Sequence, residues 1–243
     1  MEADAPHIIP SIYLANYLNQ FEEKIRRYDV QEMRLKKGEY LTKYGVINNT
    51  AYFIKSGIIH LSLGHDQGRK SLNLFGPGTV FPIGVEIHEY RVEYEMILQA
   101  LTDIEVYRMS YPTLKKIVQE NGDFAGELLR ENCDFIGYMF FDTINQAFEP
   151  CLARICDILY LYLSKVHPSG SRIPLTQAEL ANIAGTSQAQ MERSIRLLKN
   201  EGILDTSRKQ IIIIDQEKLL AYCTLGMRSN VEEENHHMMG KKC

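Results

Sequence analysis

The 243-residue chain is 45% hydrophobic and 24% charged, and its formal net charge at pH 7 is −4. This composition is typical of a globular chain with an apolar core, and no apolar run reaches the ~18 residues that a membrane helix requires. The N-terminal segment MEADAPHIIPSIYL has acids where a signal peptide has bases, so we expect a soluble, cytoplasmic protein.

The cysteines are scattered and odd in number, which argues against a disulfide framework. They are Cys133, Cys151, Cys156, Cys223 and Cys243. No Cys-x-x-Cys pair is present, so we expect no zinc site and no iron–sulfur cluster. Free thiols of this kind behave as small buried hydrophobes.

The first half of the chain changes from a helical to a strand pattern. Residues 11–28 have the spacing of a short amphipathic helix. From about residue 35 to 110, β-branched and aromatic residues recur at every second position, in YLTKYGVI, TAYFIKSGIIHLSL, KSLNLF, YEMILQAL and IEVYRMS. Glycine-rich turns, GHDQG and FGPGTVFPIG, separate these runs. Several short strands at this spacing predict a β-barrel or jelly roll.

Two helices are predicted next, SYPTLKKIVQEN with Ser110 as its cap and a long helix from Gly122 to Phe148. Along one face of the long helix, residues follow one another at spacings of 4-3-4-3-4: Leu129, Cys133, Ile136, Phe140, Thr143 and Ala147. That spacing is typical of a coiled-coil seam. A second apolar stripe contains Phe124, Leu128, Phe135 and Met139. We therefore expect one face to pack on the barrel and the other on a second copy; the alternative is a helix buried in its own domain.

Pro150 is predicted to end the long helix. It is followed by the helical pattern CLARICDILYLYLSK and then by LTQAELANIAGTSQAQMERSIRLLKNEGIL. Thr176 and Glu179 have the spacing of a capping box, which predicts a helix over 177–184. Gly185 supplies a tight turn, and Ser187 caps a second helix. Met191, Ile195 and Leu198 form the inward face of that second helix.

This layout predicts a helix-turn-helix that reads double-stranded DNA. Arg193 can pair with guanine O6 and N7, and Gln188 with adenine N6 and N7, while Arg196 and Lys199 suit phosphates. The following EGILDTSRKQIIII predicts a β-wing. The predicted DNA-contacting residues are Thr176, Gln177, Ser187, Gln188, Ala189, Gln190, Arg193, Arg196, Lys199, Arg208 and Lys209. The alternative is a helical hairpin used only for packing.

The charge distribution agrees with a DNA reader in an acidic protein. Residues 1–149 have a net charge of −6, whereas residues 150–215 have a net charge of +2. Phosphate contact needs positive charge only in the segment that meets the DNA.

Residues 20–215 resemble the Crp/Fnr family, that of the cyclic AMP receptor protein and the fumarate–nitrate reductase regulator. The resemblance rests on the order and spacing of YFIKSGIIHLSL, FGPGTVF, ARICDILYLYL and the helix-turn-helix. It implies an α+β fold with a jelly-roll, cyclic-nucleotide-binding-like β-barrel sensor domain (1–120), a long dimerisation helix (121–149), a winged helix-turn-helix (150–216) and a C-terminal tail (217–243). It also implies a homodimer on a near-palindromic site, contact with RNA polymerase and control by a small-molecule effector.

Departures from the family pattern argue against its known ligands. The Gly-Glu pair that holds ribose falls on Pro82 and Ile83, and the Arg-Ser pair that holds phosphate falls on Tyr94 and Glu95, so we expect no cyclic AMP. The N-terminal cysteine cluster of iron–sulfur members is missing, because the first cysteine is Cys133. Haem stays open in principle, but the candidate ligands His7, His60, His65 and His88 have no ligand pattern.

The effector is therefore expected to be an unidentified, apolar or aromatic small molecule. Its predicted pocket is lined by Phe81, Ile83, Tyr94, Met96, Phe135, Tyr138 and Met139, each of which could instead be plain core. The second helix of the predicted helix-turn-helix also departs from the family pattern, since Gln188 and Ala189 replace the family's Arg and Glu. We expect a half-site that differs from the common family consensus.

The sequence leaves three alternative functions. The first is an effector-controlled transcriptional regulator, in the form of an activator. The second is a constitutive DNA-binding regulator whose barrel has lost its ligand. The third is an enzyme or storage protein on a cupin-like barrel, which needs a His/His/Glu metal set on strands; His65 falls in a predicted turn, and no catalytic triad or phosphate loop is seen. We expect no enzyme and no catalytic or metal-binding residues.

Overall fold

The computed structural model describes residues 11–42, 49–65, 68–82, 95–166, 170–208, 210–229 and 231. The described residues form two compact units: a first unit within residues 12–137, and a second unit that begins at residue 138 and also includes Ser11. The long helix α3 (Gly122–Phe148) has residues in both units and has the bounds that the sequence predicts. No helix among the described residues is long and apolar enough to cross a membrane.

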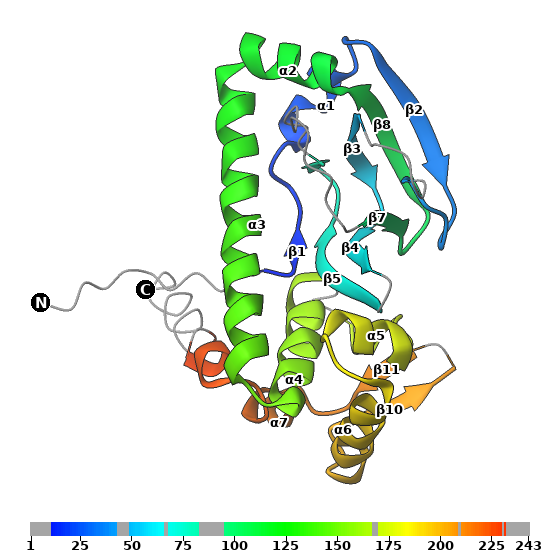
Figure 1. Cartoon of the computed structure of the whole chain (residues 1–243), viewed down its shortest axis with the longest axis vertical. Helices are drawn as coiled ribbons and strands as arrows, with labels where there is room; N and C mark the ends of the chain where they lie inside the picture. The colour runs from blue at the N-terminus through cyan, green and yellow to red at the C-terminus, as the bar shows by residue number, and fades with distance from the viewer. Residues whose placement is uncertain are drawn as a thin grey trace, which may run out of the picture. The chain divides into compact units, whose positions relative to one another are not determined.

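The first unit contains two four-stranded sheets (Figure 1). One has the strand order β1-β5-β4-β7 and the other β2-β8-β3-β6. The strands are β1 (Tyr13–Leu14), β2 (Val30–Leu35), β3 (Thr50–Ser56), β4 (Ile59–His65), β5 (Gly68–Phe75), β6 (Val80–Phe81), β7 (Glu95–Ala100) and β8 (Ile104–Ser110). Only β1 and β5 pair in parallel among them. The α+β, jelly-roll-like fold is confirmed, but over the described residues the sheets do not close into the predicted barrel.

The predicted helix over residues 11–28 is wrong. This segment contains β1, the 3₁₀ turn η1 (Asn19–Phe21) and a single helical turn, α1 (Glu22–Ile25). The carbonyls of Ile12 and Leu14 accept hydrogen bonds from the amides of Leu74 and Gly76, at 2.8 Å each. These pairings with the β5 region satisfy backbone groups that a helix would otherwise satisfy internally. Its aliphatic residues Ile12, Leu14, Leu18 and Ile25 are buried all the same, which explains the misleading pattern.

One core cluster of the first unit joins the β2-β8-β3-β6 sheet to α2 (Tyr111–Glu120) and the start of α3. Ser110 caps α2 as predicted, because its Oγ accepts from the amide of Thr113 at 3.2 Å. Phe124 and Leu128, from the second apolar stripe of α3, belong to this core. The turn between β3 and β4 requires Gly57, whose φ is +84° and whose missing Cβ would lie 2.3 Å from the carbonyl oxygen of Asp103.

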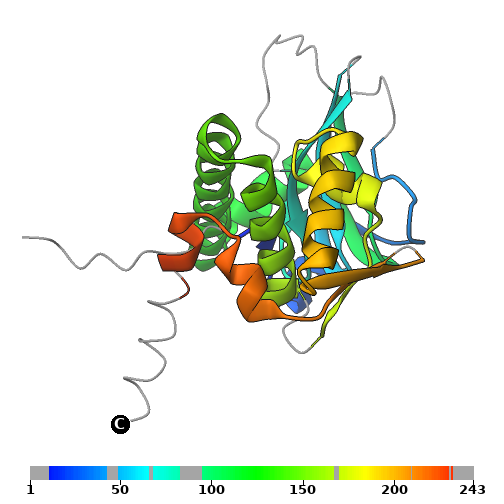
Figure 2. The ribbon, with the colours of Figure 1, turned by 90° about the horizontal axis from the view of Figure 1, so that it is seen from below.

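The second unit is a winged helix (Figures 1 and 2). Pro150 is the N-cap of the helix that follows α3. The three-stranded sheet has the order β10-β11-β9. The elements are α4 (Cys151–Leu161), the π-helical turn η2 (Tyr162–Val166), β9 (Arg172–Ile173), α5 (Gln177–Ile183), α6 (Gln188–Asn200), β10 (Leu204–Ser207), β11 (Gln210–Ile213) and α7 (Gln216–Ala221).

The start of the predicted tail is part of this second unit. Figure 2 shows α7, in orange, beside α4, and residues 225–229 are again helical. Leu219, Cys223, Met227 and Val231 are buried. The amide of Thr224 donates to Asp157 of α4 at 2.9 Å. Residues 216–229 and Val231 therefore contribute to the core of the winged helix, and residues 230 and 232–243 lie outside the described part.

Candidate nucleic-acid interface

The first helix of the motif, α5, begins with the capping box that its sequence predicts. Thr176 Oγ1 accepts from the amide of Glu179 at 3.1 Å, and Glu179 Oε2 accepts from the amide of Thr176 at 2.7 Å. Two backbone amides that a helix start leaves unpaired are thereby satisfied. Leu180 and Ile183 are buried, so the side chains of α5 fix it against its own unit.

The turn between the two helices depends on Gly185, whose φ is +58°. Its missing Cβ would lie 3.3 Å from the side chain of Gln146, so both backbone conformation and space favour glycine. Ser187 caps α6, since its Oγ accepts from the amide of Gln190 at 3.3 Å. The turn and the cap together set the direction in which α6 leaves α5.

Helix α6 has a buried apolar face and an exposed polar face. Met191, Ile195 and Leu198 are buried as predicted. The exposed residues include Gln188, Ala189, Gln190, Arg193 and Arg196. The N-terminal part of this face therefore presents amide and guanidinium donors to solvent, which are the groups that read base edges in a major groove.

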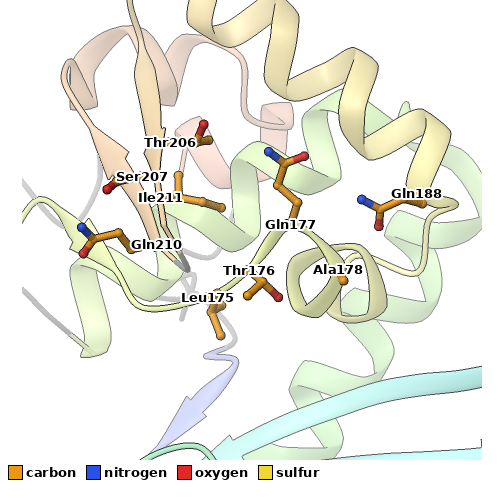
Figure 3. A pocket seen from close by; sticks show the side chains of 9 residues that line it. All are labelled: Leu175, Thr176, Gln177, Ala178, Gln188, Thr206, Ser207, Gln210 and Ile211. Atoms are coloured by element: carbon orange, nitrogen blue, oxygen red, sulfur yellow. The ribbon is translucent and has the colours of Figure 1, made fainter.

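A hollow of about 360 Å³ lies between the start of α5, the start of α6 and the wing (Figure 3). In Figure 3 the Gln177 side chain stands between Gln188 and the wing residues. The residues that line the hollow are Leu175, Thr176, Gln177, Ala178, Gln188, Thr206, Ser207, Gln210 and Ile211. None of these is charged, so the hollow offers neutral hydrogen-bond donors, which are common partners of DNA phosphates.

The wing residues Thr206, Ser207 and Gln210 were missed by sequence reasoning, which selected only the cations of the wing. The available signal was the Thr-Ser pair before Arg208, in a predicted turn beside the motif. The short strand β9 was missed as well, although Ile173 pairs with Ile211 and adds an edge to the wing.

The predicted phosphate-contacting cations differ in their surroundings. Lys199 Nζ lies 2.7 Å from Asp205 Oδ1 and donates to Thr206 Oγ1 at 3.1 Å, so it links α6 to β10. Arg196 and Lys199 border a second hollow of about 350 Å³ beside Gln177 and Thr206. Arg208 is exposed at the tip of the wing, and Lys209 lies outside the described residues. An exposed ion pair is weak, so Lys199 could exchange Asp205 for a phosphate at little cost.

Comparisons with known proteins agree with this geometry. Residues 153–222 match the Crp-like helix-turn-helix domain, and residues 32–121 match the cyclic nucleotide-binding domain. The chain belongs to the Crp/Fnr family. It is therefore a sequence-specific DNA-binding transcriptional regulator with an effector-binding domain, as the sequence predicts.

Known relatives and the solved structures of other proteins are similar to this Crp/Fnr chain over most of its length. The cAMP-activated global transcriptional regulator CRP of Salmonella typhimurium is 24% identical over 169 residues, which are 68% of this chain and 80% of the relative. The CRP-like protein Clp of Xanthomonas oryzae pv. oryzae is 24% identical over 175 residues, covering 68% and 75%. The structure of the c-di-GMP responsive global regulator CLP of Xanthomonas campestris has a TM-score of 0.68 at 21% identity, covering 79% of this chain and 97% of that one. A putative regulator of the Crp/Fnr family from Eubacterium rectale has a TM-score of 0.68 at 18% identity, covering 84% and 94%.

The structure of this Crp/Fnr chain places only some of the predicted effector-pocket residues close together. The rings of Phe81 and Phe135 lie 5.8 Å apart. Phe75, which sequence reasoning missed, lies 4.4 Å from Phe81 and 5.8 Å from Phe135. Met96 is half-buried on β7. Ile83 and Tyr94 lie outside the described residues, whereas Tyr138 and Met139 belong to the second unit, where the Tyr138 ring lies 6.3 Å from Phe141.

A buried carboxyl group on α3 lies next to β6. Both oxygens of Glu131 are 3.2 Å from the amide nitrogen of Val80, and only 2% of the residue is exposed. Burial raises the pKa of Glu131 well above its usual value, although the Val80 amide opposes the shift. The sequence signal was an acid inside the second apolar stripe, between Leu128 and Phe135.

The predicted dimerisation residues of α3 are exposed in the single chain. Leu129, Ile136 and Phe140 are 65%, 49% and 67% exposed, and Cys133, Thr143 and Ala147 are exposed too. Ile144 and Phe148 extend the same kind of surface toward the end of the helix. A Crp/Fnr chain on its own therefore leaves an apolar helix face in water.

Histidine positions give no ligand set among the described residues, where no group of three His, Cys, Asp or Glu side chains could hold a metal ion. The His60 ring contacts Ser71 Oγ across β4 and β5. His65 is the last residue of β4 and does not lie in the predicted turn. His7 and His88 lie outside the described residues.

Proposed function

We propose that this regulator acts as an effector-controlled homodimeric activator on a near-palindromic DNA site. The observation that carries the proposal is the exposed amide and guanidinium face of α6 beside a neutral polar hollow between α5 and the wing. Arg193 and Gln188 read base edges, while Arg196, Lys199, Arg208 and Lys209 contact phosphates. Thr176, Gln177 and Ser187 add neutral backbone contacts, and Ala189 and Gln190 complete the surface that enters the groove.

Selection of bound DNA from a random library, with the purified full chain, tests this proposal. We expect a half-site that differs from the common family consensus, because Gln188 and Ala189 replace a cationic and an acidic residue. Arg193→Ala should cost roughly 1–3 kcal/mol of specific binding, whereas Lys218→Ala on α7 removes a charge of the same sign and should leave the preferred sequence unchanged. A library that yields no enriched sequence, or the unchanged family consensus, would contradict it.

We propose two copies per site, paired along the seam of Leu129, Cys133, Ile136, Phe140, Thr143 and Ala147. The exposure of these side chains supports the pairing. RNA polymerase is the proposed partner of the bound dimer, a cytoplasmic location follows from that role, and no catalytic activity is assigned. The proposed domains are a sensor domain (1–120), a dimerisation helix (121–149), a winged helix-turn-helix (150–216) and a C-terminal tail (217–243).

We propose that the effector is not cyclic AMP. Pro82 and Ile83, with Tyr94 and Glu95, occupy the positions of the ribose and phosphate contacts, and a carboxylate repels a phosphate. An apolar or aromatic effector suits the phenylalanines at β5, β6 and α3. A thermal-unfolding assay with cyclic AMP, cyclic di-GMP or haem tests this proposal, since a ligand that prefers the native state raises its stability. We expect no shift of the melting temperature with cyclic AMP, and a clear rise would contradict the proposal.

The alternative, constitutive DNA binding, is favoured by one specific observation. Phe75, Phe81 and Phe135 already pack on one another, and Glu131 already pairs with the Val80 amide. A sensor filled by its own side chains needs no ligand. Tight DNA binding without any added molecule, together with no thermal shift from a fractionated cell extract, would support this alternative.

A further inference from the structure

Gln190 and Arg193 form a pair on the exposed face of α6. The Oε1 atom of Gln190 accepts from Arg193 Nη2 at 2.8 Å and from Arg193 Nε at 3.3 Å. Both residues are exposed. The two side chains are three residues apart, which places them on adjacent turns of one helix face.

The first turn of α6 fixes one member of this pair. The backbone amide of Gln190 donates to Ser187 Oγ at 3.3 Å, so the cap fixes the backbone of Gln190. Ala189, four residues before Arg193, has no group that could compete for the guanidinium. The neighbour available to Arg193 on the preceding turn is therefore Gln190.

The geometry of the contact determines which edge of the guanidinium stays available. Arginine carries five N–H donors in a planar fork, and Gln190 occupies the edge formed by Nε and Nη2. The end formed by Nη1 and the outer hydrogen of Nη2 remains, and this end can donate to both O6 and N7 of a guanine. Because the amide is neutral, it orients the guanidinium without cancelling its charge, which a carboxylate would do.

We infer that Gln190 is a specificity-determining residue that positions Arg193 end-on toward guanine. Its own Nε2 group donates to an acceptor on the neighbouring base pair, namely N7 of a purine, O6 of guanine or O4 of thymine. The pair thus reads two adjacent base pairs as one unit. This inference rests on the proposed function, since it assumes that α6 enters the major groove.

The test compares base preference, not affinity alone, with the full-length protein and the site that it selects. Gln190→Met keeps the length of the side chain but removes its hydrogen bonds. We expect it to lower discrimination for guanine opposite Arg193 by about tenfold, while binding to unrelated DNA stays within about twofold. In an Arg193→Ala background the same change should have no further effect on that base pair, because the guanidinium that Gln190 orients is gone.

A second variant separates the two roles of the amide. Gln190→Glu keeps an acceptor for Arg193 but loses the amide donor, so it should retain the guanine preference and lose the preference for purine N7, guanine O6 or thymine O4 at the neighbouring base pair. Its overall affinity should fall, because the carboxylate offsets the charge of Arg193. Asn200→Met removes an exposed amide from the far end of α6 and serves as the matched control, with no change at either base pair. Circular dichroism melts of all variants confirm that α6 is folded.

The outcomes distinguish the two levels of the proposal. A wild-type protein that selects no DNA sequence overturns the proposed function and this inference with it. A wild-type protein that selects a site, with full guanine discrimination retained in Gln190→Met, overturns only the pairing of Gln190 with Arg193. A loss of discrimination that is equal in the presence and absence of the Arg193 guanidinium also overturns the pairing.

Discussion

At the scale of single residues, the second unit contains a buried carboxyl group, that of Asp157 on α4. The residue is 2% exposed and accepts from the amide and hydroxyl of Thr224, at 2.9 and 3.0 Å, and from Asn145 Nδ2 at 3.3 Å. Burial raises its pKa from 3.8 to about 6, although the bonds from Thr224 oppose the shift. The nearby groups Cys156 and Cys223 are buried thiols whose pKa values are raised by burial, so they stay protonated over this range.

The raised pKa of Asp157 predicts a pH dependence of stability. Between pH 4 and 6 the native state holds a proton that the unfolded chain has released, so the contribution of Asp157 falls as the pH rises. The shift from 3.8 to about 6 corresponds to a loss of up to roughly 3 kcal/mol across this window. Asp157→Asn cannot titrate, and urea unfolding at pH 4, 5, 6 and 7 should show a flatter profile for this variant than for the wild type.

The control for this experiment is Asp205→Asn, an exposed carboxylate on β10 whose pKa is lowered by the hydrogen bond and charge of Lys199. It should leave the slope between pH 4 and 6 essentially unchanged. Glu131 in the first unit also has a raised pKa, so the informative quantity is the difference between wild type and variant. Parallel profiles for wild type and Asp157→Asn would show that Asp157 titrates normally.

At the scale of elements, the helix start of α5 depends on its capping box. Helix α5 has seven residues, which is too short for independent stability. Thr176→Ala removes the hydroxyl that accepts from the Glu179 amide, and we expect it to lower the free energy of unfolding by about 1 kcal/mol. Thr176→Ser retains the hydroxyl and should lose much less. The midpoint of urea unfolding without DNA measures this directly, and equal midpoints for the two variants would contradict the role of the cap.

Local signals explain which elements could be predicted from the sequence. Helices α3, α5 and α6 follow from caps, a left-handed glycine and apolar spacing, all of which act within a few residues. Strands β1, β2 and β9 could not be predicted, because they depend on partners far along the chain. The strand β2, VQEMRL, has only exposed and half-buried positions, and these do not alternate regularly, so its sequence has no period-two apolar pattern.

The candidate site divides in the same way. Arg193 and Gln188 follow from their position on a predicted helix, since helical geometry alone places them on the outer face. The grouping of Thr206, Ser207 and Gln210 with Gln177 depends on how the wing folds back on α5, and no local pattern specifies that. Phe75 joins Phe81 and Phe135 through the pairing of two different sheets with α3, which is equally non-local.

At the scale of the whole molecule, charge and apolar surface are separated along the chain. The net charge is −6 over residues 1–149 and +2 over residues 150–215, so the attraction to phosphates is concentrated in the winged helix. The exposed apolar residues Leu129, Ile136 and Phe140 lie on α3 instead. The surface that we propose for pairing two chains and the surface that we propose for DNA therefore belong to different elements.

This separation predicts that dimerisation can be removed without damage to the DNA-reading surface. Phe140 is 67% exposed on the seam of α3, and Phe140→Glu would place a charge opposite its symmetry mate in a paired seam. We expect monomers by analytical ultracentrifugation at micromolar concentration, and at least about tenfold weaker binding to a two-half-site DNA, because the second half-site then binds independently. Phe140→Leu keeps the seam apolar and should stay dimeric, whereas binding to a single half-site should be the same for both variants. A dimer that persists in Phe140→Glu would mean that the chains pair through another surface, since a buried pair of like charges at this position would cost more than the seam could offset.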